Sequence, residues 1–256
     1  MILVMGEILF DIFPDARRLG GAPFNFAFHL KRLGFDVRFV SRVGKDNLGR
    51  EILDFLSDGG FDTADIQTDP DHPTGTVNIS MHPDGGHAFS IVRDTAYDHM
   101  VTNDRIRKLS ASRWRLFYTG TLIQRNRNNA ALVRSILANK PTGAVCFCDI
   151  NLRPGCYSAG TITSSLAQAD ILKVNEEELI EITGSKTGIP DVAHAVKELM
   201  AEYALEQVIL TKGSRGSRWF IPNRSFHSPV PGNRCAVKDT VGAGDAYAAM
   251  AAAGTI

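Results

Sequence analysis

The chain has 256 residues, of which 44% are hydrophobic, so it is long enough to bury a full core as one large domain. Its 28 basic and 28 acidic residues give a net charge of zero, which argues against nucleic acid or an anionic membrane as the main partner. No apolar run approaches the roughly 18 residues of a membrane-spanning helix, and the opening Met1-Ile2-Leu3-Val4 is typical of a first strand, not of a signal peptide.

Apolar runs typical of strands alternate with amphipathic stretches typical of helices along most of the chain. The expected strands are residues 2–10, 37–43, 116–119, 144–150, 171–174, 208–211 and 217–221. The expected helices are residues 23–33, 48–56, 126–138, 161–168, 176–182 and 191–203. This repetition predicts an α/β fold with a mostly parallel sheet covered by helices on both faces.

Residues 76–81 and 87–93 break this alternation. They are joined by a Pro-Asp-Gly-Gly stretch and predict a β-hairpin with no helix after it, which on an α/β domain is typical of an edge decoration.

The four cysteines form no C-x-x-C pair; they are Cys146, Cys148, Cys156 and Cys235. Cys146 and Cys148 fall on one face of an expected strand, where buried thiols are common. We therefore expect reduced core thiols and a cytoplasmic protein.

The last helical stretch contains an unusual combination of small residues and one acid. Thr240 can cap a helix, and the alanine-rich run that follows it favours helix. Gly242, Ala243 and Gly244 then lie in or beside the first turn, where free backbone N–H groups and the positive end of the helix dipole favour an anion. Asp245 would repel such an anion, so its expected role is that of a general base that takes a proton from an alcohol.

Two other interpretations of this stretch compete with the catalytic one. The first is a plain helix start flanked by glycine, with the aspartate placed to suit the helix dipole. The second is a dinucleotide-binding fingerprint, which lacks its third glycine and the chain needed to build a nucleotide domain.

Polar residues follow several expected strands at their carboxyl ends, where ligands gather in an open parallel sheet. They are Asp11, Asp149, Asn151, Arg153, Asn175, Glu178, Thr211, Lys212 and Gly213. Each alone is also an ordinary cap or turn residue, but their joint placement at one edge favours a site.

Short hydrogen-bonding side chains suit the neighbouring hydroxyls of a sugar, and Asp11 and Asn25 supply them. Gly20 and Gly21 allow the backbone to come close to a sugar ring, although they also suit a tight turn before a helix that starts with proline. Arg93 and Arg153 are candidates for substrate or phosphate oxygens, or else ordinary surface arginines.

The sequence resembles the ribokinase-like (PfkB) sugar kinases at both ends. Residues 239–246 (DTVGAGDA) are similar to the C-terminal signature of that family, and residues 20–25 (GGAPFN) resemble its N-terminal signature in the form typical of fructokinases. The resemblance covers nearly the whole chain. It implies one ribokinase-like three-layer α/β/α domain over residues 1–256, with a small β lid at about 11–19 and 73–98 that is often also a homodimer contact.

The same resemblance implies roles for individual residues. The sugar would be bound by Asp11, Gly21, Asn25, Arg93, Asn151 and Arg153. The nucleotide would be bound by Asn175, Thr211, Lys212, Gly213 and Gly216. Glu178 would act through water on Mg²⁺, as the last residue of an N-x-x-E element that is otherwise a solvated helix start. Catalysis would fall to Asp245 with Gly242, Ala243 and Gly244.

The predicted function is ATP-dependent phosphorylation of a primary hydroxyl of a small sugar, with Mg²⁺ bridging the phosphates and K⁺ as a further cation. Fructose, converted to fructose 6-phosphate, is the leading substrate. The alternative substrate is 2-keto-3-deoxygluconate, because Arg153 could pair with its carboxylate. The alternative of another class is a non-catalytic sugar-binding protein that keeps the kinase fold.

Members of the family usually continue for some tens of residues beyond the motif that contains Asp245. That portion supplies part of the adenine pocket and often part of a potassium site. Since this sequence ends at Ile256, we expect a domain that is short at its C-terminus. Either the remaining portion lies outside this sequence or the protein is short, and the sequence leaves open whether the adenine pocket is complete.

Overall fold

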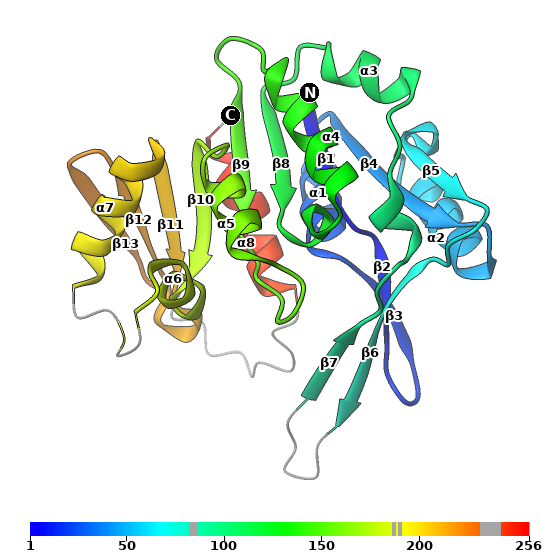
Figure 1. Cartoon of the computed structure of the whole chain (residues 1–256), viewed down its shortest axis with the longest axis horizontal. Coiled ribbons are helices and arrows are strands. Elements are labelled where there is room, and N and C mark those ends of the chain that lie inside the picture. The colour runs from blue at the N-terminus through cyan, green and yellow to red at the C-terminus, as the bar shows by residue number, and fades with distance from the viewer. Residues whose placement is uncertain (82–86, 186–187, 189–190, 231–241, 256) are drawn as a thin grey trace.

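The fold is built around one large sheet, seen in a computed structural model that describes residues 1–81, 87–185, 188, 191–230 and 242–255 (Figure 1). The sheet has nine strands in the order β13-β12-β11-β10-β9-β8-β1-β4-β5. Neighbouring strands from β5 to β11 are parallel, and β12 and β13 are antiparallel. The strands are β1 Ile2–Met5, β4 Val37–Gly44, β5 Ile66–Asp69, β8 Leu116–Gly120, β9 Val145–Asp149, β10 Ile171–Asn175, β11 Gln207–Thr211, β12 Ser217–Ile221 and β13 Arg224–Ser228.

Helices cover both faces of this sheet. One face packs against α1 Ala22–Arg32, α2 Asn47–Asp58 and α8 Ala243–Ala253. The other packs against α3 Asp104–Ser110, α4 Arg127–Ala138, α5 Ala159–Leu166, α6 Glu176–Thr183 and α7 Val192–Tyr203. Alternate residues of β1 enter the two cores, Ile2 on one side and Leu3 on the other, because successive side chains of a strand point to opposite faces. The predicted three-layer α/β/α architecture is confirmed.

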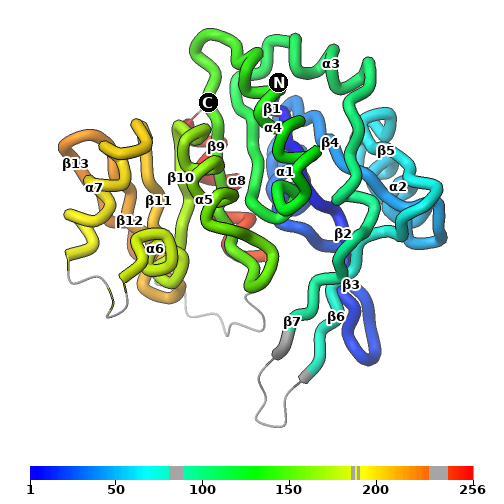
Figure 2. The backbone as a smooth tube through the Cα atoms, in the orientation of Figure 1, coloured from blue at the N-terminus to red at the C-terminus, as the bar shows by residue number. Residues whose placement is uncertain are grey.

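A second sheet of four strands, called here the small sheet, projects from the main body (Figure 2). Its order is β3-β2-β6-β7, with β2 and β6 parallel and the outer pairs antiparallel. The strands are β2 Leu9–Ile12, β3 Arg17–Gly20, β6 Gly75–Met81 and β7 His87–Ile91. Two separate stretches of chain therefore build it. The turn expected between β6 and β7 lies outside the described residues.

The single first strand predicted over residues 2–10 is wrong. β1 ends at Met5, and β2 begins at Leu9 in the small sheet. The break falls at Gly6, where a Cβ atom would lie 2.1 Å from Cγ of Pro23, so the start of α1 occupies the space of a side chain. Residues 6–8 are all buried, so the apolar pattern continues through the break and hides it. Asp11 therefore belongs to the small sheet and does not follow a strand of the large one.

The other expected strands and helices are present with small shifts of their bounds, whereas β5, β13 and α3 were not predicted. Four short 3₁₀ turns complete the described chain: η1 Thr63–Asp65, η2 Ala96–His99, η3 Leu122–Arg125 and η4 Gly213–Arg215. No helix in the described part of the chain is long and apolar enough to cross a membrane. Cys146, Cys148 and Cys156 are buried and free, and Cys235 lies outside the described residues.

Helix α1 packs beside α8 on the same face of the large sheet. Phe26 stacks on Tyr118 of β8 with ring centroids 4.0 Å apart, and the alanines of α8 belong to the same apolar core. Ala248, Ala249 and Ala252 are buried there, and their small side chains let the two helices pack closely. This packing joins the chain near residue 25 to the chain near residue 245.

Candidate active site

The candidate site lies where α8 begins. Gly242 is the N-cap of α8, and Asp245 lies in its first turn. The side chain of Asn25, on α1, donates a hydrogen bond from Nδ2 to Oδ2 of Asp245 over 2.8 Å, across 220 positions of sequence. The two predicted signature segments thus meet in space. Thr240, the expected cap, lies outside the described residues.

The start of α8 can receive an anion. The first backbone N–H groups of a helix have no intrahelical acceptor, and the helix dipole adds positive potential there. Gly242 offers no capping side chain, and Ala243 and Gly244 are exposed. A phosphate can therefore approach these amides without displacing a side chain.

Asp245 is a half-buried carboxylate in a charged neighbourhood. Burial raises its pKa, and the charge of Asp149 raises it further. The hydrogen bond from Asn25 and the charges of Lys173 and Arg153 act in the opposite direction, and the net shift is upward. A carboxylate whose pKa is raised towards the working pH is a better general base than an ordinary surface aspartate.

A buried ion pair lies beneath α8, formed by Lys173 of β10 and Asp149 of β9. Nζ of Lys173 lies 2.9 Å from each carboxylate oxygen of Asp149, and a Cβ atom at Gly244 would lie 3.7 Å from the same Nζ. Burial lowers the pKa of Lys173, but the charge and hydrogen bonds of Asp149 outweigh it and the pKa is raised. Lys173 therefore keeps its positive charge, paired with Asp149, beside the first turn of α8.

Sequence reasoning missed Lys173. The available signal was a lysine inside the apolar run of residues 171–174, since a lysine in a buried strand needs a partner.

The sugar-side candidates lie on the small sheet and at the start of α1. Burial raises the pKa of Asp11, the charge of Arg153 lowers it and that of Asp245 raises it, so these three charges share one region. Oδ2 of Asp11 lies 2.8 Å from the place where a Cβ atom of Gly20 would be, so a larger residue on the paired strand would displace the Asp11 carboxylate. Gly21 is the N-cap of α1.

Glu7, between β1 and β2, is a second residue that the sequence did not single out. It is buried, and its Oε2 has no hydrogen-bond partner among the described residues. Burial raises its pKa to about 7, Arg153 lowers it and Asp245 raises it, which places Glu7 in the same charged region. Its signal was an acid between Gly6 and the apolar residues 8–10.

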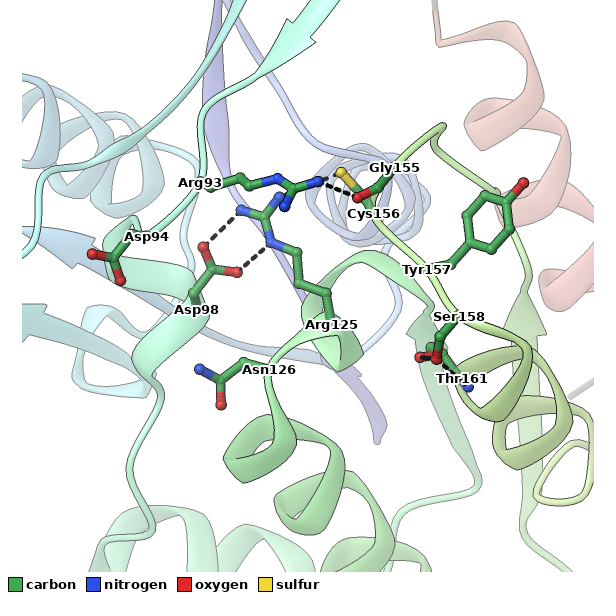
Figure 3. Close-up of a pocket in the computed structure, with 10 residues that line it drawn as sticks. All are labelled: Arg93, Asp94, Asp98, Arg125, Asn126, Gly155, Cys156, Tyr157, Ser158 and Thr161. Atoms are coloured by element: carbon green, nitrogen blue, oxygen red, sulfur yellow. Dashed lines mark hydrogen bonds and ion pairs between the residues drawn. The ribbon is translucent and has the colours of Figure 1, made fainter.

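A cavity of about 340 Å³ lies beside this region (Figure 3). It is lined by Arg93, Asp94, Asp98, Arg125, Asn126, Gly155, Cys156, Tyr157, Ser158 and Thr161. Arg93 donates a hydrogen bond to the carbonyl oxygen of Gly155. Arg125 donates hydrogen bonds to both carboxylate oxygens of Asp98, over 2.7 and 2.6 Å. Among the predicted sugar residues only Arg93 is part of this lining. Asn151 and Arg153 lie just before Gly155 in the chain, with Arg153 exposed.

The nucleotide-side candidates lie at the ends of β10 and β11. Asn175 and Glu178 form a capping box at the start of α6, in which each side chain accepts a hydrogen bond from the other's backbone N–H at 2.8 Å. Oε1 of Glu178 also accepts from the N–H of Leu152 at 3.0 Å. Burial, and then the charge of Asp149, raise the pKa of Glu178 against these hydrogen bonds. Glu178 thus has a structural role as well as the predicted metal role.

The loop after β11 is tied to the same corner. Thr211 ends β11, Gly213 begins η4, and the N–H of Lys212 donates to the carbonyl of Gly216 over 2.8 Å. Nζ of Lys212 lies 3.6 Å from a carboxylate oxygen of Glu176, at the start of α6. The structure therefore brings Asp11, Asn25 and Arg153 into the neighbourhood of Asp245. The loop after β11 lies at the start of α6 with Asn175, and Arg93 lies at the cavity.

Comparison with known proteins agrees with this arrangement. Residues 15–256 match the family described as pfkB family carbohydrate kinase. Fructokinase-1 of Zea mays is 30% identical over 265 residues, which span 96% of this chain and 80% of that protein. Fructokinase of Klebsiella pneumoniae is 28% identical over 263 residues, spanning 99% of this chain and 83% of that one.

Solved fructokinase structures share the fold. The apo fructokinase of Vibrio cholerae O395 matches with a TM-score of 0.81 and 25% identity, over 97% of this chain and 86% of that one. The same enzyme with fructose, ADP and calcium ion bound matches with a TM-score of 0.81 and 24% identity, over 97% and 81% of the two chains. The match to a carbohydrate kinase family, the fructokinase relatives and the shared fold identify an enzyme that transfers a phosphoryl group to a sugar. The chain belongs to the pfkB family of carbohydrate kinases.

Proposed function

We propose that this sugar kinase uses ATP to phosphorylate the primary hydroxyl of fructose, giving fructose 6-phosphate. The observation that carries the proposal is the 2.8 Å hydrogen bond between Asn25 and Asp245, which joins the sugar-side signature to the base. The choice of fructose is supported by the fructokinases of plants and bacteria to which the chain is similar.

In this proposal Asp11, Gly21 and Asn25 hold the sugar hydroxyls, and Asp245 takes the proton of the attacking hydroxyl. The N–H groups at the start of α8, from Gly242 to Gly244, stabilise the charge that develops on the transferred phosphoryl group. Further sugar contacts come from Arg93, Asn151 and Arg153. Because the raised pKa of Asp245 has burial as its largest cause, the base works best when the closed site excludes water.

The nucleotide would extend from α8 to the loop after β11. In our proposal its binding residues are Asn175, Thr211, Lys212, Gly213 and Gly216. The loop after β11 is joined to the start of α6 through Glu176, because Lys212 and Arg215 both form ion pairs with this residue. The corner is therefore held together before a ligand arrives, which favours a preformed loop.

Mg²⁺ fits the donor set of this corner. Asp149 raises the pKa of both Glu178 and Asp245, so the carboxylates repel one another and leave negative charge uncompensated. Hard oxygen ligands of this kind suit Mg²⁺, which keeps much of its water, and Glu178 would act through such water. When bound, the ion would neutralise charge on the phosphates of ATP. A K⁺ site remains a prediction.

We further propose that residues 1–256 form one domain in which the small sheet closes over the sugar. A homodimer contact through the same sheet and a cytoplasmic location are further proposals. The exposure of Phe89 on β7, at 59%, supports the dimer contact, because large apolar side chains in the open often mark contact surfaces.

A coupled assay of ADP release with Mg·ATP tests the proposal on fructose, 2-keto-3-deoxygluconate, ribose and adenosine. We expect turnover on fructose, and in Asp245→Asn a loss of kcat of about 100- to 10,000-fold with a nearly unchanged KM for the sugar, since a general base acts in the transition state. Asp54→Asn, an exposed change on α2, is the matched control.

Two outcomes would redirect the proposal. Preference for 2-keto-3-deoxygluconate that disappears in Arg153→Gln would favour the acid sugar as substrate, because Arg153 shares the region of Asp11 and Asp245. Fructose binding by calorimetry without any ADP release would favour the non-catalytic sugar-binding protein.

A further inference from the structure

Three side chains with metal-binding atoms converge at the base of the small sheet. His72 lies just before β6, Asp94 lies just after β7, and His99 closes η2. One nitrogen or oxygen atom from each lies within 4.8 Å of the others. Two imidazoles and a carboxylate from three segments thus share one small volume.

Both imidazoles face the same carboxylate oxygen. Nε2 of His99 lies 2.7 Å from Oδ1 of Asp94, and Nε2 of His72 lies 3.9 Å from it. The two rings are stacked, with centroids 3.6 Å apart and an interplanar angle of 15°. Because the lone pair of an imidazole nitrogen lies in the plane of its ring, the two rings must tilt towards Oδ1 before one ion can contact all three ligands.

The opposite edge of His72 is held by a buried carboxylate. Nδ1 of His72 lies 3.1 Å from Oδ2 of Asp69, whose side chain is 1% exposed. A proton on Nδ1 donated to Asp69 leaves the lone pair on Nε2, on the side of Asp94. This carboxylate–histidine pairing is the arrangement that orients histidines in metal sites.

Arg42 of β4 fixes the surrounding shell. Its Nε lies 2.8 Å from Oδ2 of Asp69, and its Nη1 donates to the carbonyl of His99 over 2.6 Å. Asp69 also accepts the backbone N–H groups of Asp71 and His72 at 2.9 and 3.0 Å. The guanidinium of Arg42 therefore links the carboxylate that holds His72 to the backbone of His99.

A plain hydrogen-bond network is the simpler explanation of a single His–Asp pair. It accounts for the contact between His99 and Asp94, since the side chain of Asp94 is 77% exposed. It does not account for a second imidazole turned towards the same oxygen and backed by its own buried carboxylate.

We propose that His72, Asp94 and His99 bind a divalent transition metal of the zinc class, with water completing the coordination on the exposed side. Imidazole nitrogen and carboxylate oxygen are ligands that zinc accepts in three-residue sites. The ion would tie the chain that enters β6 and the chain that leaves β7 to η2, which packs against β4. It would fix the base of the small sheet without touching the reacting groups.

Zinc titration of the full chain by calorimetry, with metal analysis after dialysis, tests the site. We expect one Zn²⁺ per chain and a rise in melting temperature with zinc. His72→Ala and His99→Ala should each weaken binding at least 10-fold, and Asp69→Asn roughly 10- to 100-fold as a change in the supporting shell. His194→Ala is the matched control, because His194 on α7 also lies beside a carboxylate, 3.2 Å from Glu198.

An anomalous diffraction map at the zinc edge gives a readout that does not depend on variants. A peak about 2.0–2.2 Å from the two Nε2 atoms and from Asp94 is the expected result. His72→Gln and His99→Gln replace the alanine variants if those lose their native circular dichroism spectrum. Zinc binding that is unchanged in both histidine variants, or a peak elsewhere on the chain, would overturn the proposal.

Discussion

Four carboxyl groups around the start of α8 share one property: burial raises the pKa of each. They are Glu7, Asp11, Glu178 and Asp245. Fixed positive charge in the same region comes from Lys173, and Arg153 acts on three of the four. Groups with raised pKa values gathered in one place are typical of a functional site, because their burial is useful only if a ligand exploits it.

Glu7 gives a prediction about stability against pH. Its pKa rises from 4.5 to about 7 on folding, so between these values the unfolded chain has released the proton that the folded chain keeps. The contribution of Glu7 is therefore full below pH 4.5 and is lost as the pH rises through about 7, a change of about 3 kcal/mol.

Urea unfolding of the wild type and of Glu7→Gln from pH 4.5 to pH 8 measures this effect. The difference between the two free energies of unfolding should shift by about 3 kcal/mol in favour of the variant as the pH rises, while the other titrating groups cancel. Glu177→Gln, an exposed change on α6, should leave the profile as it is. Parallel profiles for wild type and Glu7→Gln would show that Glu7 does not keep its proton.

The sequence could predict the residues of the site that belong to motifs, and it could not predict their supports. The contact of Asn25 with Asp245 agrees with the two signature segments, although the catalytic and sugar-binding roles remain predictions. Lys173 and Glu7 leave a signal in the sequence, an ionisable group inside or beside an apolar run, but the buried partner of Lys173 is visible only in three dimensions. Whether a buried charge has a partner is a property of packing, which no local pattern contains.

At the scale of single elements, α1 begins under tight constraint. Gly21 has φ of 110°, and a Cβ atom there would lie 2.6 Å from the carbonyl oxygen of Glu7. Gly34, just beyond the other end of α1, has φ of 87° and no atom within 4 Å of such a Cβ. The two glycines share a left-handed backbone, and only the first is also crowded.

A comparison of Gly21→Ala with Gly34→Ala therefore separates the cost of a positive φ angle from the cost of a steric clash of the new Cβ atom with the backbone. We expect Gly34→Ala to lower the free energy of unfolding by about 1 kcal/mol through backbone strain alone. Gly21→Ala should cost more than about 2 kcal/mol, because its Cβ must also displace the backbone at Glu7. Urea midpoints of the two variants give the comparison. Equal losses would mean that the backbone at Glu7 moves aside easily. The positive φ angle would then be the reason that position 21 favours glycine.

Elements whose apolar residues recur at regular helical or strand spacing were predicted well. The break between two consecutive strands was not predicted. Helix α7 and the buried strands β9, β10 and β11 follow from their apolar spacing. The division of residues 2–10 into β1 and β2 could not be predicted, since it depends on Pro23 filling the space beside Gly6. The short edge strands β5 and β13 lack a distinct alternating pattern, and β13 is exposed throughout.

At the scale of the whole molecule, the chain has no excess positive charge that would attract the phosphates of ATP. Its 28 basic and 28 acidic residues balance, and the carboxylates near Asp245 outnumber the cations beside them. We therefore expect the phosphates of ATP to bind beside these carboxylates together with an added cation.

Chelation tests this dependence. Excess EDTA should lower turnover on fructose at least about 100-fold, and excess Mg²⁺ should restore it. Restoration by Mg²⁺ alone separates this requirement from the zinc site at His72, which a chelator would also empty. Full turnover in EDTA would contradict a metal role in the corner of Glu178.

The contact between α1 and α8 also has a consequence for biosynthesis. Asn25 and Asp245 are 220 positions apart, and at about 5–20 residues per second a ribosome needs roughly 10–45 s to add that length. During this interval the apolar side of α1 that α8 later covers has no partner from α8. We therefore expect the nascent protein to present this apolar surface to chaperones, and the contact that we propose for phosphoryl transfer forms only when nearly all of this sequence has been translated.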